Sequence, residues 1–288
     1  MSEVWSTAMG TWCTDLADLM LPFDRVILSR ADLVFMGSGT PGFAYAVNDP
    51  CPDGFSQALK SDLSMVTAHY PQGAHLRLDL CSFRTGAATP RVVGTNGALW
   101  LMRQANPRVS GVIRRGLADN RDMSLFLFPW LPIPPWAEFR IFIRQGQRIG
   151  VSQYHADPVF PQIAQHEAAI AAALDTFVAS ALPRLKQPDT TLDVLAEPMP
   201  QGGFRIRLVD LATFGPRTDC LLFAAETGRP FDGSLQFRKP EVTLTMPILK
   251  AEADQTMHPA SAMPTPPALP TPAAMPTPPA PEDDVWRI

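Results

Sequence analysis

Two aspartates have the type and spacing needed to hold a divalent cation. Asp193 lies in the run T-L-D-V-L and Asp210 in R-L-V-D-L, each near one end of an expected strand. The turn residues Gly202 and Gly203 lie between them, so antiparallel pairing would bring both carboxylates to one face. Magnesium is commonly held by one or two carboxylates together with phosphate oxygens. The pair therefore suits a magnesium–phosphate site, although ordinary surface or turn positions remain the alternative.

Other chemistries find less support. The five histidines show no ligand spacing such as H-E-x-x-H. The four cysteines are widely separated without a C-x-x-C pair, which predicts reduced thiols rather than disulfides or a zinc ribbon. Ser152 precedes a Gln-Tyr-His run, but no G-x-S-x-G elbow surrounds it. A serine-hydrolase site is therefore not indicated.

Composition favours one large domain or two closely packed ones. The chain has 288 residues, of which 46% are hydrophobic and 18% charged. Its net charge of −4 gives no global attraction to nucleic acid. A local basic groove could still be present, because the net charge does not show how the charges are distributed. The amino terminus lacks a signal-peptide pattern, and the most apolar stretch, 124–135, contains four prolines. We therefore expect a cytoplasmic protein without a membrane partner.

Hydrophobic periodicity predicts the elements that must position the aspartates. Apolar residues at three- to four-residue steps predict helices, and alternation of polar and apolar residues predicts strands. The expected elements are a helix over 4–20, a hairpin of 138–144 and 148–152, a helix over 161–182, and a hairpin of 191–195 and 204–211. Helices laid on antiparallel sheets make the expected fold class α+β.

The composition changes sharply near residue 252. Met-Pro-Thr-Pro-Pro-like units repeat there, and frequent proline removes backbone donors and favours extended geometry. We predict a Pro-rich disordered tail over 252–288. Its last residues, Asp283 to Ile288, fit either a docking peptide or a frayed end.

Two blocks in the second half of the chain carry a more specific signal. The first is P-W-A-E-F-R-I-F-I-R-Q-G-Q-R-I-G-V-S-Q-Y (135–154), and the second is L-V-D-L-A-T-F-G-P-R-T-D-C-L-L-F (208–223). They resemble the A-E-F-R-x-F-x…I-x-I-S-Q and D-F-N-P-F-G-x-x-T-D-x-L-L-F motifs of the cell division cycle protein 123 family. A weaker similarity, R-L-D-L-C-S-F-R, lies at 77–84. The resemblance extends over roughly 5–241.

The resemblance implies an ATP-grasp-like fold, in which two lobes with antiparallel sheets enclose a cleft for ATP and Mg²⁺. It divides the chain into an N-terminal lobe (1–127), a C-terminal lobe that begins with the hinge (128–251), and the tail. Asp193 and Asp210 would be the metal ligands, and Arg140 the catalytic residue that positions ATP or an acidic acceptor. The residues implied in nucleotide binding are Arg77, Arg103, Phe128, Trp130, Leu131, Glu138 and Arg140. Glu138 and Arg140 share one face of their strand, so a structural ion pair is the alternative for them.

The family pattern implies three alternative functions. The first is an ATP-dependent ligase that activates a carboxylate or phosphate on a macromolecular acceptor, either a protein or peptide or an RNA end. The second is an ATP-dependent assembly chaperone for a translation initiation factor subunit, as in eukaryotic members. The third is a catalytically degenerate nucleotide-binding scaffold. It is suggested by Ala212, which replaces an asparagine of the family motif and has no side-chain oxygen. Arg77 and Arg103 also replace lysines, so the charge is kept with a planar donor group.

Overall fold

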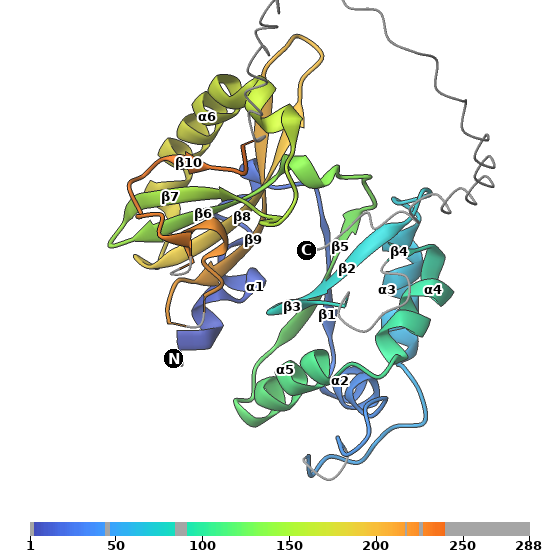
Figure 1. The fold of residues 1–288 in the computed structure, drawn as a ribbon. Helices are drawn as coiled ribbons and strands as arrows, with labels where there is room; N and C mark the ends of the chain where they lie inside the picture. Colours follow the sequence, from blue (N-terminus) through green and yellow to red (C-terminus); the bar gives the residue numbers. More distant parts are fainter. Residues whose placement is uncertain (1–2, 44–46, 84–90, 217, 225–226, 240–288) are drawn as a thin grey trace, which may run out of the picture. The chain divides into compact units, whose positions relative to one another are not determined.

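The computed structural model describes residues 3–43, 47–83, 91–216, 218–224 and 227–239 (Figure 1). The predicted tail at 252–288 lies outside these residues. The described chain forms two five-stranded sheets, each with its own helices. None of the helices in the described ranges has the length and apolar character needed to cross a membrane.

The first sheet is antiparallel, with strand order β1-β5-β2-β3, and β4 also pairs with β2. Its strands are β1 (Asp24–Leu28), β2 (Ala74–Leu78), β3 (Cys81–Ser82), β4 (Arg91–Val92) and β5 (Met123–Pro129). The helices of this lobe are α2 (Arg30–Gly37), α3 (Gln57–Thr67), α4 (Gly94–Arg103) and α5 (Pro107–Ala118). Their buried side chains form one core with this sheet.

Strand β5 is buried on both faces, as its nearly continuous apolar sequence predicts. Leu125 and Leu127 point into the core of the first lobe. Phe126 and Phe128 point the other way and pack with the core of the second lobe. A single strand therefore ties the two cores together, because side chains alternate between its faces.

The second sheet has the order β10-β7-β6-β8-β9, and only the short β10 runs parallel to its neighbour. Its strands are β6 (Glu138–Arg144), β7 (Gln147–Gln153), β8 (Thr190–Pro198), β9 (Phe204–Thr213) and β10 (Leu235–Gln236). Helix α6 (Pro161–Ala181) packs on one face of it. Short 3₁₀ turns lie at η4 (Pro135–Ala137), η5 (Leu182–Arg184) and η6 (Leu221–Phe223). Both predicted hairpins and the predicted helix over 161–182 are confirmed.

The predicted helix over 4–20 is wrong. The segment forms three short pieces instead, η1 (Glu3–Thr7), α1 (Met9–Trp12) and η2 (Ala17–Leu19). Ala8 is extended between the first two, and the N–H groups of Met9 and Gly10 donate to the backbone oxygen and Oδ1 of Asp79. These tertiary hydrogen bonds replace the helical ones.

The large apolar side chains that share the helical spacing in this N-terminal segment are nevertheless buried. Trp5 joins the core of the first lobe, whereas Met9, Trp12, Leu16 and Met20 pack in the core of the second. The segment therefore contacts both lobes before it enters β1. The predicted division of the chain at residues 127 and 128 stays a proposal.

Gly150→Ala is expected to lower the free energy of unfolding by about 1–3 kcal/mol. A Cβ at this position of β7 would lie 2.6 Å from Cζ of Phe223, whose ring stacks on Phe231 at a centroid distance of 4.4 Å. Gly111→Ala in α5 is the matched control, because no heavy atom lies within 4 Å of its added Cβ. This control should stabilise the protein by about 0.5–1 kcal/mol. Urea unfolding of the two variants measures both changes in the free energy of unfolding. A Gly150→Ala variant as stable as the wild type would contradict the packing of Gly150 against Phe223.

Candidate functional site

Asp193 and Asp210 are direct cross-strand partners on β8 and β9. Their side chains therefore share one face of the second sheet, with Cβ atoms about 5 Å apart. The register shifts between Asp193 and Val194, where Val194 pairs with Leu208 and leaves Val209 as the extra residue of a bulge. Bulges of this kind re-aim side chains and are frequent beside active sites. The convergence expected from the hairpin is thus present, and a bulge that the sequence did not predict sets its register.

Each carboxylate accepts hydrogen bonds from its own arginine. Nη2 of Arg77, on β2 of the first sheet, donates to Oδ1 of Asp210 at 2.6 Å. Arg140, on β6, forms a bidentate pair with Asp193, from Nε to Oδ1 at 2.6 Å and from Nη2 to Oδ2 at 2.8 Å. Arg140 and Asp193 are themselves register partners, so this second pair lies within one sheet.

Arg140 is held by two further contacts. Its Nη1 donates to the backbone oxygen of Asp219 at 3.2 Å, and its guanidinium lies 5.0 Å from the ring centroid of Tyr154. Tyr154 was not a candidate in the sequence, although the family-like run ends on it. Glu138, the one acid of β6, is buried and its Oε2 lies 3.5 Å from Nε2 of His155.

The electrostatics of the carboxylate pair favour a nearby cation. Burial raises the pKa of Asp193; the hydrogen bonds from Arg140 oppose this shift, and the charge of Asp210 adds to it. Burial also disfavours the charge on Arg140, but the hydrogen bonds and charge of Asp193 outweigh burial and raise the pKa of the arginine. Two neighbouring carboxylates repel each other, so positive charge close to both lowers their energy.

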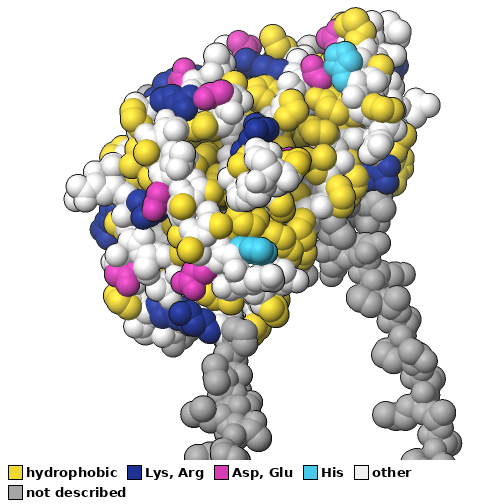
Figure 2. All heavy atoms as spheres, turned by 90° about the horizontal axis from the view of Figure 1, so that it is seen from above, with side chains coloured by type: hydrophobic (Ala, Val, Ile, Leu, Met, Phe, Trp, Pro, Cys, Tyr) yellow, Lys and Arg dark blue, Asp and Glu magenta, His cyan; other side chains and the backbone are white. Residues whose placement is uncertain are grey.

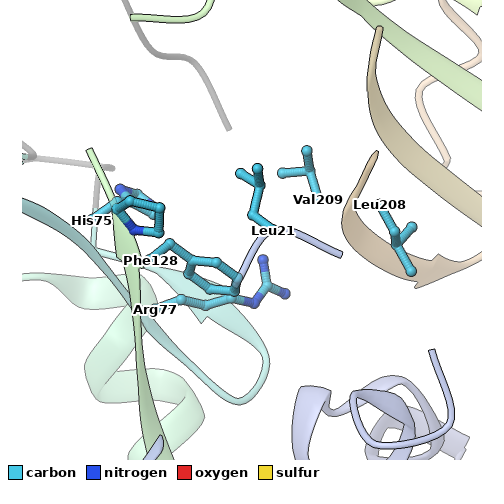
Figure 3. A pocket seen from close by; sticks show the side chains of 7 residues that line it. Leu21, His75, Arg77, Phe128, Leu208 and Val209 are labelled. Carbon is cyan, nitrogen blue, oxygen red and sulfur yellow. The ribbon is translucent and has the colours of Figure 1, made fainter. Parts of the chain in front are cut away.

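A small apolar hollow lies beside Arg77 (Figure 3). Its lining residues are Leu21, His75, Arg77, Phe128, Pro129, Leu208 and Val209. The Arg77 side chain runs beside Phe128, with its guanidinium toward the side on which Leu208 and Val209 lie. Nε of Arg77 is buried and has no hydrogen-bond partner within the described residues. Buried donors are normally paired, so this atom is available to an acceptor on a ligand.

The expected hinge lies where the chain passes from β5 to β6. Phe128 lines the hollow, but the N–H of Trp130 is already bonded to the oxygen of Gly73 at 3.0 Å. The oxygen of Leu131 accepts from Ile133, and its N–H makes no hydrogen bond within the described chain. In the expected hinge over 128–133, the N–H of Leu131 is therefore a backbone donor that a ligand could use.

Arg103 lies apart from this group. Its guanidinium lies 4.4 Å from the ring centroid of Phe35 in the first lobe, although its Nη1 is also buried without a partner in the described ranges. The structure thus brings together Arg77, Arg140, Asp193, Asp210 and Phe128, and leaves Arg103 outside this group. On the face seen in Figure 2, hydrophobic side chains gather with Lys and Arg among and around them.

The donor set fits a magnesium site that is completed by phosphate. No group of three or more His, Cys, Asp or Glu side chains suited to a metal occurs in the part of the chain that the structure describes. The protein would therefore supply two carboxylates, a number that Mg²⁺ accepts when phosphate oxygens and water fill its octahedron. Oδ2 of Asp210 accepts no hydrogen bond from the described residues, and its side chain is 24% exposed. Ala212, opposite Thr191 on β8, adds no side-chain ligand.

Comparison with known proteins assigns the family. Residues 113–264, just over half of the chain, match the family model D123. The cell division cycle protein 123 of Eremothecium gossypii is 26% identical over 183 residues, which are 54% of this chain and 50% of that protein. A translation initiation factor eIF2 assembly protein of Sclerotinia sclerotiorum is 32% identical over 109 residues, 37% of this chain and 25% of that protein. The chain spans half or less of the length of these curated relatives.

A solved structure shows the same fold. Cdc123 from Schizosaccharomyces pombe superposes with a TM-score of 0.62 at 15% identity, covering 82% of this chain and 97% of that one. The expected α+β fold class, with two largely antiparallel sheets, is confirmed. The sequence blocks, the fold and the family model agree, and this chain belongs to the D123, or cell division cycle protein 123, family.

Proposed function

We propose that this chain binds ATP together with Mg²⁺ between its two lobes. The observation that carries this proposal is the convergence of Asp193 and Asp210 on one face of the second sheet, with Arg77 reaching Asp210 from the first. Two carboxylates for a metal and guanidinium groups for phosphates are the two halves of a nucleotide–metal site.

The surrounding residues suit the separate parts of the nucleotide. The apolar side chains of Phe128, Leu208 and Val209 would contact the face of a base, and the N–H of Leu131 would be a donor for its edge. Arg77 and Arg140 would contact the phosphates. Arg103 stays a proposed phosphate contact because its Nη1 is buried and unpaired in the described chain. Glu138 stays a proposed cleft residue.

Binding can be tested by calorimetry with ATP and magnesium. The wild-type protein should bind, and Asp210→Asn should weaken binding by about tenfold or more, because a ligand of the metal becomes neutral. Asp175→Asn is the matched control, since Asp175 is an exposed carboxylate of α6 that pairs with Arg148. No binding by the wild type, or equal binding by Asp210→Asn, would contradict the proposal.

One use of the bound nucleotide is ligation. A metal and guanidinium groups around the phosphates neutralise the charge that develops in phosphoryl transfer, which needs alignment more than a protein nucleophile. In this role Arg140 would orient ATP or an acidic acceptor, either a protein or peptide carboxylate or an RNA end. Release of ADP or AMP that depends on one of these acceptor classes would support ligation.

The other use is assembly of a protein partner, and the names of the curated relatives favour it. Two features of the site agree with a nucleotide that is held rather than consumed. Both oxygens of Asp193 are bonded to Arg140, and Ala212 supplies no ligand. An assembly role on a translation initiation factor subunit would place the chain in the cytoplasm. Stoichiometric capture of such a subunit, without turnover with any acceptor, would support assembly; absence of both partner and turnover would leave the nucleotide-binding scaffold.

A further inference from the structure

The two arginine–aspartate pairs at the site differ in one respect. Arg140 and Asp193 are neighbours within the second sheet, so their contact persists whatever the first lobe does. Arg77 belongs to the first sheet and Asp210 to the second, so their 2.6 Å contact joins the lobes. This second pair therefore depends on the positions of both sheets, and a ligand that enters between them can separate it.

Arg77 is poorly explained as a purely structural bridge. Its side chain is 5% exposed, yet Nε has no hydrogen-bond partner among the described residues. A guanidinium evolved only to tie two lobes would be expected to satisfy its buried donors. This one instead lines the hollow, beside Phe128, with a donor to spare.

We propose that Arg77 is a built-in cation that holds Asp210 in the absence of nucleotide and exchanges this carboxylate for a phosphate oxygen when nucleotide and metal bind. The inference deepens the proposed ATP site and rests on it. A guanidinium only donates hydrogen bonds, so it can pair with either anion, and a phosphate offers it the same planar, bidentate geometry.

The exchange makes nucleotide and cation depend on each other. A bare divalent cation must displace Arg77 from Asp210 or lie beside its positive charge, and like charges at such distances repel. A nucleotide without cation must bring its phosphates toward two carboxylates. When both ligands bind, a phosphate oxygen would pair with Arg77 and the cation would pair with Asp210. Each ligand therefore raises the affinity for the other by the same factor.

Arg77→Met separates this inference from the proposed function, because it changes the two affinities in opposite directions. Methionine fills a similar apolar volume without charge. Calorimetric titration with MgCl₂ alone should show binding about tenfold tighter in Arg77→Met than in wild type, since the competing cation is gone. Titration with ATP and Mg²⁺ should show weaker binding in the same variant, since a phosphate contact is lost.

Two further variants locate the effect. Arg77→Lys keeps a positive charge and should keep bare magnesium binding weak. Arg77→Met combined with Asp210→Asn should lose the gained magnesium affinity, because the carboxylate itself is neutral. Circular dichroism and urea unfolding of each variant establish that it is folded. If Arg77→Met does not fold, Arg77→Gln, which also lacks the positive charge, replaces it in the same titrations.

The outcomes distinguish the two proposals. If wild type binds ATP with Mg²⁺ but Arg77→Met binds bare magnesium no more tightly than wild type, the exchange role of Arg77 is wrong and the proposed function stands. If wild type does not bind ATP with Mg²⁺, the proposed function fails. In that case, a gain of bare magnesium affinity in Arg77→Met would still show that Arg77 competes for Asp210. Tight binding of bare magnesium by wild type would overturn the exchange.

Discussion

Arg140→Met is expected to lower the free energy of unfolding by about 3–5 kcal/mol. The side chains of Arg140 and Asp193 are only 14% and 15% exposed, and both oxygens of the aspartate are bonded to the arginine. Removing the arginine leaves a buried carboxylate without its partner and beside a second carboxylate, Asp210. The expected loss of stability is larger than the net contribution of the ion pair, because much of it is the cost of leaving the Asp193 carboxylate buried without a partner. Urea unfolding of the variant measures it.

The double variant Arg140→Met with Asp193→Leu is the decisive comparison. With both charges gone, most of the lost stability should return, since apolar replacements of a buried ion pair are often neutral or stabilising. Arg184→Met is the matched control. Arg184 pairs with Asp18 on the surface, where such pairs contribute about 0–1 kcal/mol. A loss in Arg140→Met no greater than that in Arg184→Met would show that the site pair is not buried in solution as it is here.

The elements that local pattern predicted well are those that local geometry determines. The turn of the first hairpin has positive φ at Gln145 and Gly146, 51° and 71°, which is the backbone twist that a two-residue hairpin requires. Helix α6 carries apolar residues at helical spacing and ends before Pro183, where a proline would interrupt it. The pairing of Asp193 with Asp210 could also be predicted, because it depends on a single hairpin whose turn contains Gly202 and Gly203.

The features that the sequence could not predict depend on distant parts of the chain. The N-terminal segment has helical spacing from residue 4 to 20, but Asp79, some 70 positions away, accepts hydrogen bonds from two of its backbone N–H groups. Nothing near Arg140 indicates that Asp193, 53 residues later, is its partner. The contact between the guanidinium of Arg103 and the ring of Phe35 is likewise not indicated by the residues around either position. A one-dimensional pattern carries no information on such contacts.

Phe142→Ala is expected to cost about 3–5 kcal/mol of stability and to weaken nucleotide binding in the protein that remains folded. Phe142 is fully buried on the site face of β6, and its ring meets the rings of Phe214, Phe223 and Phe231 at centroid distances of 5.3–5.8 Å. These three rings belong to the chain that follows β9. The same chain presents the oxygen of Asp219 to Arg140. Losing the central ring should therefore loosen both the packing and the hold on Arg140.

Phe139→Ala on the same strand separates the two effects. Phe139 is equally buried but points to the opposite face, into the core beneath α6 and the N-terminal segment. Truncating it should cost a similar 3–5 kcal/mol by the same loss of burial and the same cavity. Nucleotide affinity, measured by calorimetry well below the unfolding transition, should fall in Phe142→Ala and stay near the wild-type value in Phe139→Ala. Equal losses of affinity in both variants would mean that general destabilisation, and not the aromatic cluster over Arg140, controls the site.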